Sequence, residues 1–445
     1  MTTSIPLADT GRRALARNAA YNLVGQALPL AVGLVAIPFA ARYLGTERFG
    51  VLGLVWALIG SFGLLDLGLG RATTKYVATA LARNEHVTLG PVAALSVLVQ
   101  TVLGLLGAAV LALLTPWLVE RALSVPTALQ SEVRACFLVV ALSIPLVSFS
   151  TSLRAILEAA LRFDIVNLVR TPMAALMFAV PAIVAAAGGG LVAITVVLLV
   201  VRLLAVLAWA QAIRRVLPGV HWAPRPSWQS FRPLAVYGAW TAISNAIAPA
   251  LAYLERFLLA SFAGIAALGY YTAPAEAVMR LLIVPGALAG ALFPAISATD
   301  VEGAAAKGAS AERLALTSLR YLAAILAPIA LLLIVLAHPL LRIWLGPEYA
   351  AQGGGAFAIL AAGVFINGLA FVPTAYLYGR GRPDVPAKFH VGELLLYGLA
   401  GWLLIRNFGI TGAALAWTLR VTVDAALLGI AMWRVSAREL ERTGP

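Results

Sequence analysis

The sequence predicts an all-α membrane protein with about twelve transmembrane helices in two pseudo-symmetric bundles of six. Of 445 residues, 62% are hydrophobic and only 11% are charged, whereas soluble domains carry charged residues at about a quarter of positions. Backbone groups in a bilayer must be hydrogen-bonded internally, so only helices or closed barrels can span it. Long apolar runs, such as 321–337, favour helices over the alternating strands of a barrel.

Individual spans follow from apolar windows of roughly 20 residues, the length that crosses a hydrocarbon core about 30 Å thick. Such windows lie at 18–41, 49–70, 89–115, 133–153, 165–187, 190–212, 233–260, 267–292, 317–338, 355–378, 389–405 and 409–433. The predicted organisation is an N-terminal bundle (1–215), a cytoplasmic linker (216–232) and a C-terminal bundle (233–445). The links are too short to fold as independent domains, which start at about 50 residues.

The basic residues predict the orientation of the chain. Its net charge is +13, which fits either an anionic partner or the excess of Lys and Arg in cytoplasmic loops. About 22 of the 32 basic residues fall in alternate links on the side of the N-terminus. This asymmetry places both termini in the cytoplasm and accounts for most of the charge. Because the basic residues are scattered over several loops, nucleic-acid binding is not indicated.

The chain repeats itself at an offset of about 220 residues. RYLGTERFGVL (42–52) resembles SFAGIAALGYY (261–271), which aligns Gly45 with Gly264, and Arg162 aligns with Arg382. Because each repeat holds six spans, both repeats enter the membrane in the same orientation. We therefore expect an axis along the membrane normal to relate them, as in transporters with parallel repeats.

Prolines interrupt corresponding spans of the two halves. Pro29 lies in the first span and Pro249 in the seventh, again 220 residues apart. Proline removes a helical hydrogen bond and bends the helix, although membrane helices often tolerate it. Matched interruptions in two repeats indicate a transport site, so we expect these prolines to act as hinges.

Enzyme signatures are missing from the sequence. It contains no GxxxxGK[ST], GxSxG or HExxH pattern, Cys136 is its single cysteine, and its four histidines lie far apart. A P-loop, a hydrolase elbow and a zinc-protease site are therefore not indicated. No cofactor and no metal site are expected from these patterns.

The informative residues are charges inside or near the spans, because each costs a few kcal/mol at the bilayer centre and usually faces a cavity or a partner. Glu276 and Arg280 stand four residues apart on one helical face, where they form either a structural ion pair or part of a cavity lining. The full set of candidate cavity residues is Asp66, Arg202, Glu255, Arg256, Glu276, Arg280, Arg420 and Asp424. A surplus of guanidinium groups would suit phosphate, which they bind in a bidentate manner.

Several segments resemble the oligosaccharide flippases of polysaccharide biosynthesis, in the multidrug/oligosaccharidyl-lipid/polysaccharide exporter superfamily. They include ARYLGTERFGVLGL (41–54), LLDLGLGRATTKYVA (64–78), LEAALRFDIVN (157–167), LERFLLASFAGIAALGYYTA (254–273), ALFPAIS (291–297) and GITGAALA (409–416). The resemblance runs in order over nearly the whole chain. The family's acid late in the seventh helix corresponds to Glu255, and its motif at the end of the second helix contains Asp66.

The resemblance implies a V-shaped, two-lobed transporter in the bacterial inner membrane. It implies that an undecaprenyl-diphosphate-linked oligosaccharide is moved from the cytoplasmic to the periplasmic leaflet, with H⁺ or Na⁺ as a coupling ion. Membrane lipid and other polysaccharide-assembly proteins of the membrane are further expected partners. A flippase makes no bonds, so the chain is not expected to be an enzyme.

Two alternatives stay open on the sequence. A cation-coupled multidrug exporter of the same superfamily would share the fold and the repeat. A membrane glycan polymerase or ligase is less well supported, because the outer links are about fifteen residues or fewer, too short for a domain that would hold an acceptor.

Overall fold

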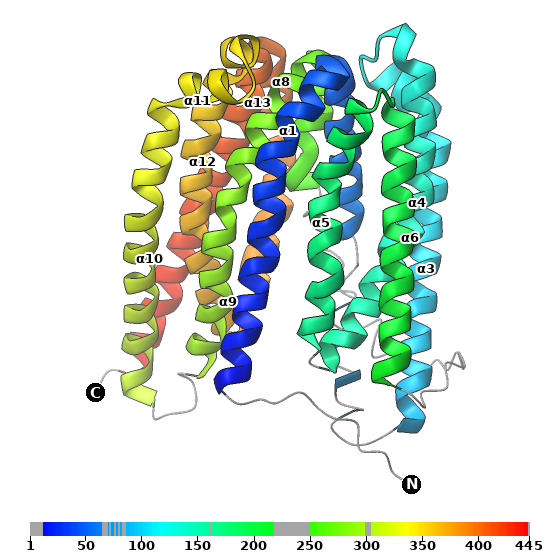
Figure 1. Cartoon of the computed structure of the whole chain (residues 1–445). Coiled ribbons are helices and arrows are strands. Elements are labelled where there is room, and N and C mark those ends of the chain that lie inside the picture. The colour runs from blue at the N-terminus through cyan, green and yellow to red at the C-terminus, as the bar shows by residue number, and fades with distance from the viewer. Residues whose placement is uncertain are drawn as a thin grey trace. The chain divides into compact units, whose positions relative to one another are not determined.

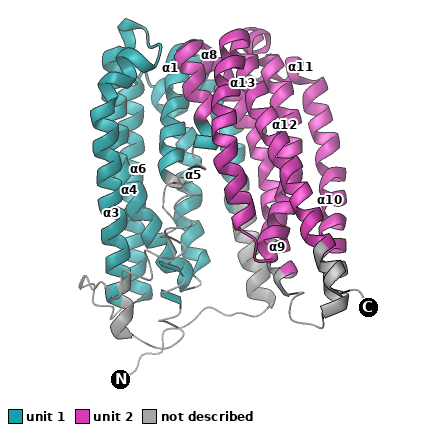
Figure 2. Cartoon of the chain, turned by 180° about the vertical axis from the view of Figure 1, so that it is seen from behind, with its two compact units in different colours: residues 1–253 teal, residues 254–445 magenta. Residues whose placement is uncertain are grey.

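The computed structural model describes residues 12–64, 70, 73–74, 77–78, 81, 86–160, 162–217, 247, 250–298 and 304–443. Every regular element in these ranges is a helix (Figure 1), as the apolar composition predicts. The chain divides into two compact units, residues 1–253 and 254–445, which Figure 2 colours separately. Each unit is described by itself below.

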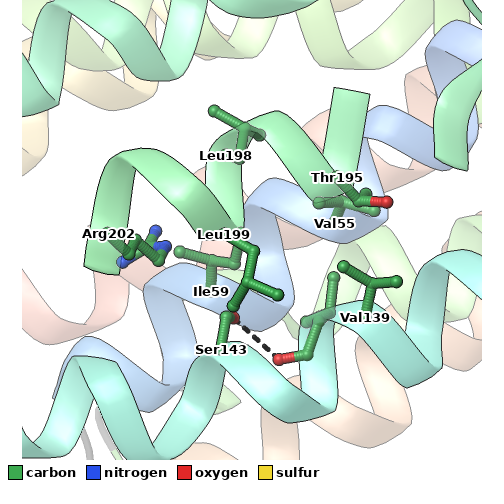
Figure 3. A pocket seen from close by; sticks show the side chains of 9 residues that line it. Val55, Ile59, Val139, Ser143, Thr195, Leu198, Leu199 and Arg202 are labelled. Carbon is green, nitrogen blue, oxygen red and sulfur yellow. Dashed lines mark hydrogen bonds between the residues drawn. The ribbon is translucent and has the colours of Figure 1, made fainter. Parts of the chain in front are cut away.

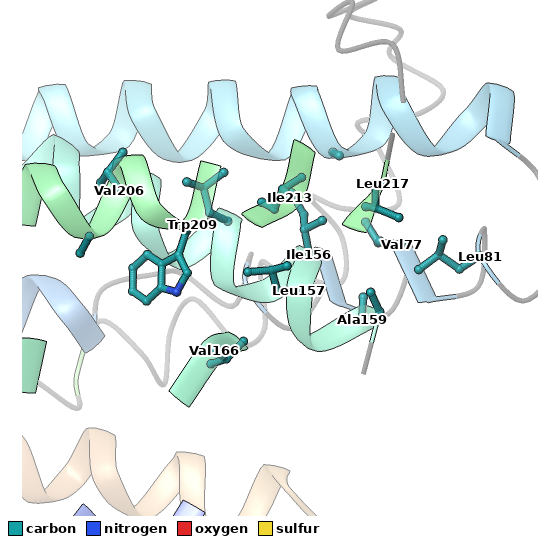
Figure 4. Packing of buried hydrophobic residues seen from close by; sticks show 14 residues of the cluster. Val77, Leu81, Ile156, Leu157, Ala159, Val166, Val206, Trp209, Ile213 and Leu217 are labelled. Carbon is teal, nitrogen blue, oxygen red and sulfur yellow. The ribbon is translucent and has the colours of Figure 1, made fainter. Parts of the chain in front are cut away.

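Unit 1 holds the first six predicted spans. Its helices are α1 (Arg12–Leu64), α3 (His86–Trp117), the π-helical turn η1 (Leu118–Ala122), α4 (Thr127–Ala159), α5 (Phe163–Ala186) and α6 (Leu191–Val216). Helix α1 packs against α5, while α4 packs against α3 and α6. Near the C-terminal ends of α4 and α6, buried apolar side chains pack together, among them Ile156, Leu157, Trp209 and Ile213 (Figure 4).

Unit 2 is organised around α12. Its elements are a helical segment that continues to residue 262, α8 (Ile265–Met279), the 3₁₀ turn η2 (Arg280–Leu282), α9 (Ile283–Ala298), α10 (Ala304–Val335), α11 (Ala337–Trp344), α12 (Pro347–Gly379) and α13 (Asp384–Thr443). Helix α12 contacts α8, α9, α10, α11 and α13. Glycines permit this crowding: a Cβ atom at Gly363 would lie 2.7 Å from the ring of Trp417 on α13.

Glycines mark where consecutive spans meet. Helix α1 is interrupted at Gly45 (φ 73°, ψ 166°) and α13 at Gly409 (φ 52°, ψ −123°), so each of these long elements contains two of the predicted spans. Gly264 begins α8 with φ 88° and ψ 166°, nearly the conformation of Gly45. Such angles are essentially restricted to glycine. The predicted alignment of Gly45 with Gly264 is therefore matched by their backbone geometry.

A second matched pair supports the internal repeat. Arg162 precedes α5 and makes two hydrogen bonds to Asp164, of 3.0 and 2.8 Å. Arg382 precedes α13 and makes two hydrogen bonds to Asp384, of 3.0 and 3.3 Å. The neighbouring carboxylate raises the pKa of both Arg162 and Arg382, because it stabilises the charged guanidinium. The two loops thus contain the same hydrogen-bonded Arg–Asp pair, 220 residues apart.

The outer faces of the helices are apolar. Leu113 on α3, Ile343 on α11 and Leu395 on α13 expose 80%, 86% and 77% of their surface, which a soluble protein would seldom tolerate over whole helices. The described residues contain nine helices that are long and apolar enough to cross a membrane. The chain is therefore a multi-pass helical membrane protein.

Some sequence predictions fall outside the described residues. They include Asp66, Pro249, nearly all of the predicted linker at 216–232 and most of the seventh span before residue 250, so the predicted domain boundary and the second hinge stay predictions. Pro29 is described. It is buried in α1, whose helical geometry breaks at Gly45 rather than at the proline.

We expect Gly45→Ala and Gly264→Ala to lower stability by about 1–3 kcal/mol each, because alanine is strained at these backbone angles. No atom lies within 4 Å of a Cβ built at either position, so crowding would contribute nothing. Thermal unfolding of the purified protein in detergent measures the effect. Gly398→Ala in α13, where a Cβ also meets open space, is the matched control and should be neutral or slightly stabilising. Equal behaviour of all three variants would contradict the assignment of strain.

Candidate functional site

The candidate site lies within unit 2 and begins with the carboxylate of Glu255. This residue is 1% exposed, and its carboxylate lies between two buried tyrosines from different elements. The hydroxyl of Tyr397 on α13 donates to Oε2 at 2.8 Å, and the hydroxyl of Tyr271 on α8 donates to Oε1 at 3.4 Å. A buried carboxylate is tolerable only when such partners replace water. Glu255 is thus held by two helices besides its own.

The adjacent Arg256 extends the site towards α8. Its Nη2 donates to Oε1 of Glu276 at 2.9 Å, and Nη2 of Arg280 donates to Oε2 of the same carboxylate at 3.1 Å. The Nε of Arg256 also lies 3.9 Å from Oε1 of Glu255. Glu276 therefore bridges two guanidinium groups, and its contact with Arg280 is the ion pair that was one of the two roles expected for these residues. Arg256 is 4% exposed, whereas the side chain of Arg280 is 30% exposed.

These buried charges and their partners form a network that extends, through Arg420, to the second helix of α13. Its guanidinium carbon lies 5.5 Å from the ring centre of Tyr397 and 6.0 Å from that of Trp417, distances at which cations are attracted to aromatic rings. Its Nη1 lies 3.6 Å from Oε2 of Glu393. Because Tyr397 hydrogen-bonds Glu255 and also contacts Arg420, it joins the two groups of charges.

The charges of this network nearly balance. It contains four carboxylates, on Glu255, Glu276, Glu393 and Asp424, and three guanidiniums, on Arg256, Arg280 and Arg420. The described part of unit 2 therefore has no surplus of guanidinium groups at this site. A role in binding phosphate has to rest on the arginine that is best exposed, Arg280, rather than on the summed charge.

Arg202 lies apart from this network, in α6 of unit 1. It is 7% exposed, and its Nη2 approaches the sulfur of Met177 at 3.4 Å. Among the described residues no carboxylate forms an ion pair with it, and its Nε has no hydrogen-bond partner. Beside it is a cavity of about 10 Å³ that Ser143 and Thr195 also line (Figure 3), room for about one water. Arg202 is thus a buried cation beside a space for one small ligand.

The structure groups the predicted residues more closely than their spacing suggested. It joins Glu255, Arg256, Glu276 and Arg280, and it places Arg420 and Asp424 in the same unit. Sequence reasoning did not single out Tyr271 or Tyr397, because a tyrosine in an apolar span resembles ordinary core. The helical phase offered one signal: Tyr397 is four residues from Glu393, on the same helical face.

Ionisable groups that a helical membrane protein keeps within its spans commonly mark a transport path, so the fold and the buried network together define a transporter-like class. Solved structures agree with this fold. An inward-facing multidrug-resistance MATE transporter of the MOP superfamily matches with a TM-score of 0.81 at 14% identity, over 96% of this chain and 100% of the other. A MOP superfamily transporter from Pyrococcus furiosus, described as having a binding pocket of reversed polarity, matches with a TM-score of 0.67 at 12% identity over 99% of both chains.

The family follows from sequence comparison. A family model described as polysaccharide biosynthesis protein matches residues 15–300, and the chain belongs to this family. A curated relative from Shigella flexneri, named provisionally as an O-antigen transporter, is 29% identical over 415 residues, which cover 93% of this chain and 96% of the relative. The resemblance seen in the sequence motifs is thereby confirmed.

We expect Arg256→Leu to destabilise the protein by about 3–5 kcal/mol, because two buried carboxylates would lose their counter-charge. Arg280→Leu should cost about 1 kcal/mol or less, since this arginine is partly solvated. Thermal unfolding in detergent compares the two variants. The double variant Arg256→Leu/Glu276→Leu should lose less stability than the summed losses of the two single variants, because it removes both partners of the ion pair. If Arg280→Leu destabilised the protein as much as Arg256→Leu, the ranking by burial would be wrong.

Proposed function

We propose that the chain is a flippase that carries an undecaprenyl-diphosphate-linked oligosaccharide from the cytoplasmic to the periplasmic leaflet of the bacterial inner membrane. The observation that carries this proposal is the match to the Shigella flexneri relative over almost the full length of both chains. The family description and the transporter fold support it. In this proposal both termini are cytoplasmic and the chain is not an enzyme.

Transport would proceed by alternating access between the two helical bundles. The charged head group would pass through the protein while the prenyl tail stays in lipid, because the tail is as apolar as the bilayer itself. Arg280 is the best candidate for contact with the diphosphate, since it is charged, partly exposed and already oriented by Glu276. Guanidinium binds phosphate oxygens in pairs and stays charged at all relevant pH values. Arg202, Arg256 and Arg420 would add positive potential.

The carboxylates would have a different role. Glu255, Glu276 and Asp66 would keep the arginines in position or couple transport to H⁺ or Na⁺. Other membrane proteins of polysaccharide assembly would supply the cargo and receive it.

A cation-coupled multidrug exporter is the second candidate, because solved structures with this fold include multidrug-resistance transporters. At 14% identity these structures show the fold alone. Efflux of cationic drugs by purified protein in vesicles, together with normal surface glycan in cells that lack the gene, would favour this candidate over the flippase.

We expect Arg280→Gln to reduce surface glycan about tenfold and to raise the pool of lipid-linked precursor, because a charge-assisted hydrogen bond contributes about 1.5–3 kcal/mol. A strain that lacks the gene, complemented with each variant, supplies both measurements. Arg280→Lys should keep part of the activity, since it retains charge without the paired donors. Arg134→Gln, which removes an exposed ion pair with Glu120, is the control. Normal glycan and a normal precursor pool in Arg280→Gln would contradict the role of Arg280.

We expect Pro29→Ala to slow transport while stability stays equal or rises, because alanine restores a helical hydrogen bond and stiffens the proposed hinge. Pro38→Ala in the same helix is the matched control, and it should transport normally. Glycan export at equal protein levels compares the two. If both variants slowed export equally, a hinge at Pro29 would be contradicted.

A further inference from the structure

Three side chains that can bind a metal ion converge within α13. His390 and Glu393 lie three residues apart on its first helix, and Asp424 lies on its second helix, beyond the break at Gly409. Each offers one donor atom, and the three atoms lie within 4.8 Å of one another. Nε2 of His390 is 3.9 Å from Oδ1 of Asp424. The chain therefore folds back at Gly409 and brings donors from two antiparallel helices to one point.

The two carboxylates of this cluster are buried and unsatisfied. Glu393 is 4% exposed and Asp424 is 6% exposed. In the described part of the chain, neither oxygen of Glu393 has a hydrogen-bond partner, and Oδ1 of Asp424 has none. Buried polar atoms are nearly always paired with protein, water or an ion, because leaving one unpaired costs about 1–3 kcal/mol or more. These oxygens therefore lack a partner that accepts electron pairs, such as a metal cation.

Charge points to the same conclusion. Among the described residues, Arg420 is the guanidinium that approaches the cluster, with Nη1 3.6 Å from Oε2 of Glu393. One guanidinium compensates one carboxylate, so with a neutral imidazole the cluster keeps one uncompensated negative charge. Two buried carboxylates in an apolar span stay ionised only beside sufficient positive charge. A bound cation would supply it.

The donor set distinguishes between kinds of cation. Mg²⁺ and Ca²⁺ prefer sites made of oxygen atoms, whereas an imidazole nitrogen together with carboxylates suits Zn²⁺ and other divalent first-row metals. We propose that His390, Glu393 and Asp424 form a binding site for one divalent transition-metal ion of this kind. Three protein ligands leave a further position for water. The side chain of His390 is 28% exposed, so the cluster reaches the surface of the chain.

Such an ion would link the two helices of α13. Its bonds would join His390, nineteen positions before Gly409, to Asp424, fifteen positions after it. They would also hold one oxygen of Glu393 while Arg420 contacts the other. The site is independent of the proposed cargo, so it can be tested without transport. The wide spacing of the four histidines in the sequence had pointed away from any metal.

The first test uses the full-length protein purified in detergent, stripped with a chelator and dialysed against zinc or manganese salts. We expect about one bound ion per chain by elemental analysis, and a rise in apparent Tm of about 3 °C or more as the ion binds the folded state. Magnesium or sodium at equal concentration should produce no such rise. Absence of bound zinc and manganese, or an equal rise with sodium, would overturn the proposal.

The second test compares variants by isothermal titration with zinc. His390→Gln and Asp424→Asn should weaken binding about tenfold or more, as losses around metal sites commonly do. His338→Gln, which changes a histidine of α11 outside the cluster, should bind zinc like the unchanged protein. Wild-type affinity in folded His390→Gln would refute the site. If a variant does not fold, the stoichiometry measured on the unchanged protein decides the question.

Discussion

The structure of unit 2 depends on one constraint: a charge within a membrane-spanning bundle has to be matched by a charge or a hydrogen-bond donor from a neighbouring helix. Glu255 satisfies this constraint through Tyr271 and Tyr397, and Glu276 does so through Arg256, with Arg280 added from its own helical run. The partners come from the helix that ends at residue 262, from α8 with its 3₁₀ turn, and from α13. Because the low dielectric makes an unmatched charge so unfavourable, these contacts fix the rotation of the helices about their own axes.

Close packing by small residues makes these contacts possible. Helix α12 is in contact with most elements of its unit, and its glycines let neighbouring backbones approach to distances that a Cβ atom would prevent. In lipid, helices gain little from hydrophobic attraction to one another, so small residues at helix interfaces provide much of the association through van der Waals contact. The polar network then specifies which faces meet, and the glycines allow them to meet closely.

The two units share their backbone pattern but differ in their buried chemistry. Gly45 and Gly264 adopt nearly the same conformation, and Arg162 and Arg382 make the same pairs of hydrogen bonds. Arg202 lies in α6 of unit 1 and Arg420 in α13 of unit 2, yet Arg202 contacts a methionine sulfur while Arg420 contacts aromatic rings and a carboxylate. The internal repeat is therefore visible in the backbone geometry and local hydrogen bonds, whereas the contacts of the buried charges differ between the two units.

The sequence by itself determined the fold class, most spans and the repeat, because these depend on apolar length, charge asymmetry and glycine or proline at matched positions, all of which are local properties of the chain. It also placed Glu276 and Arg280 on one helical face, since they are four residues apart. Only the tertiary structure decided that Tyr271 and Tyr397 hold Glu255, and that His390 meets Asp424. Those contacts join residues far apart in the chain, and they depend on how each helix is rotated against its neighbours, which no local pattern encodes.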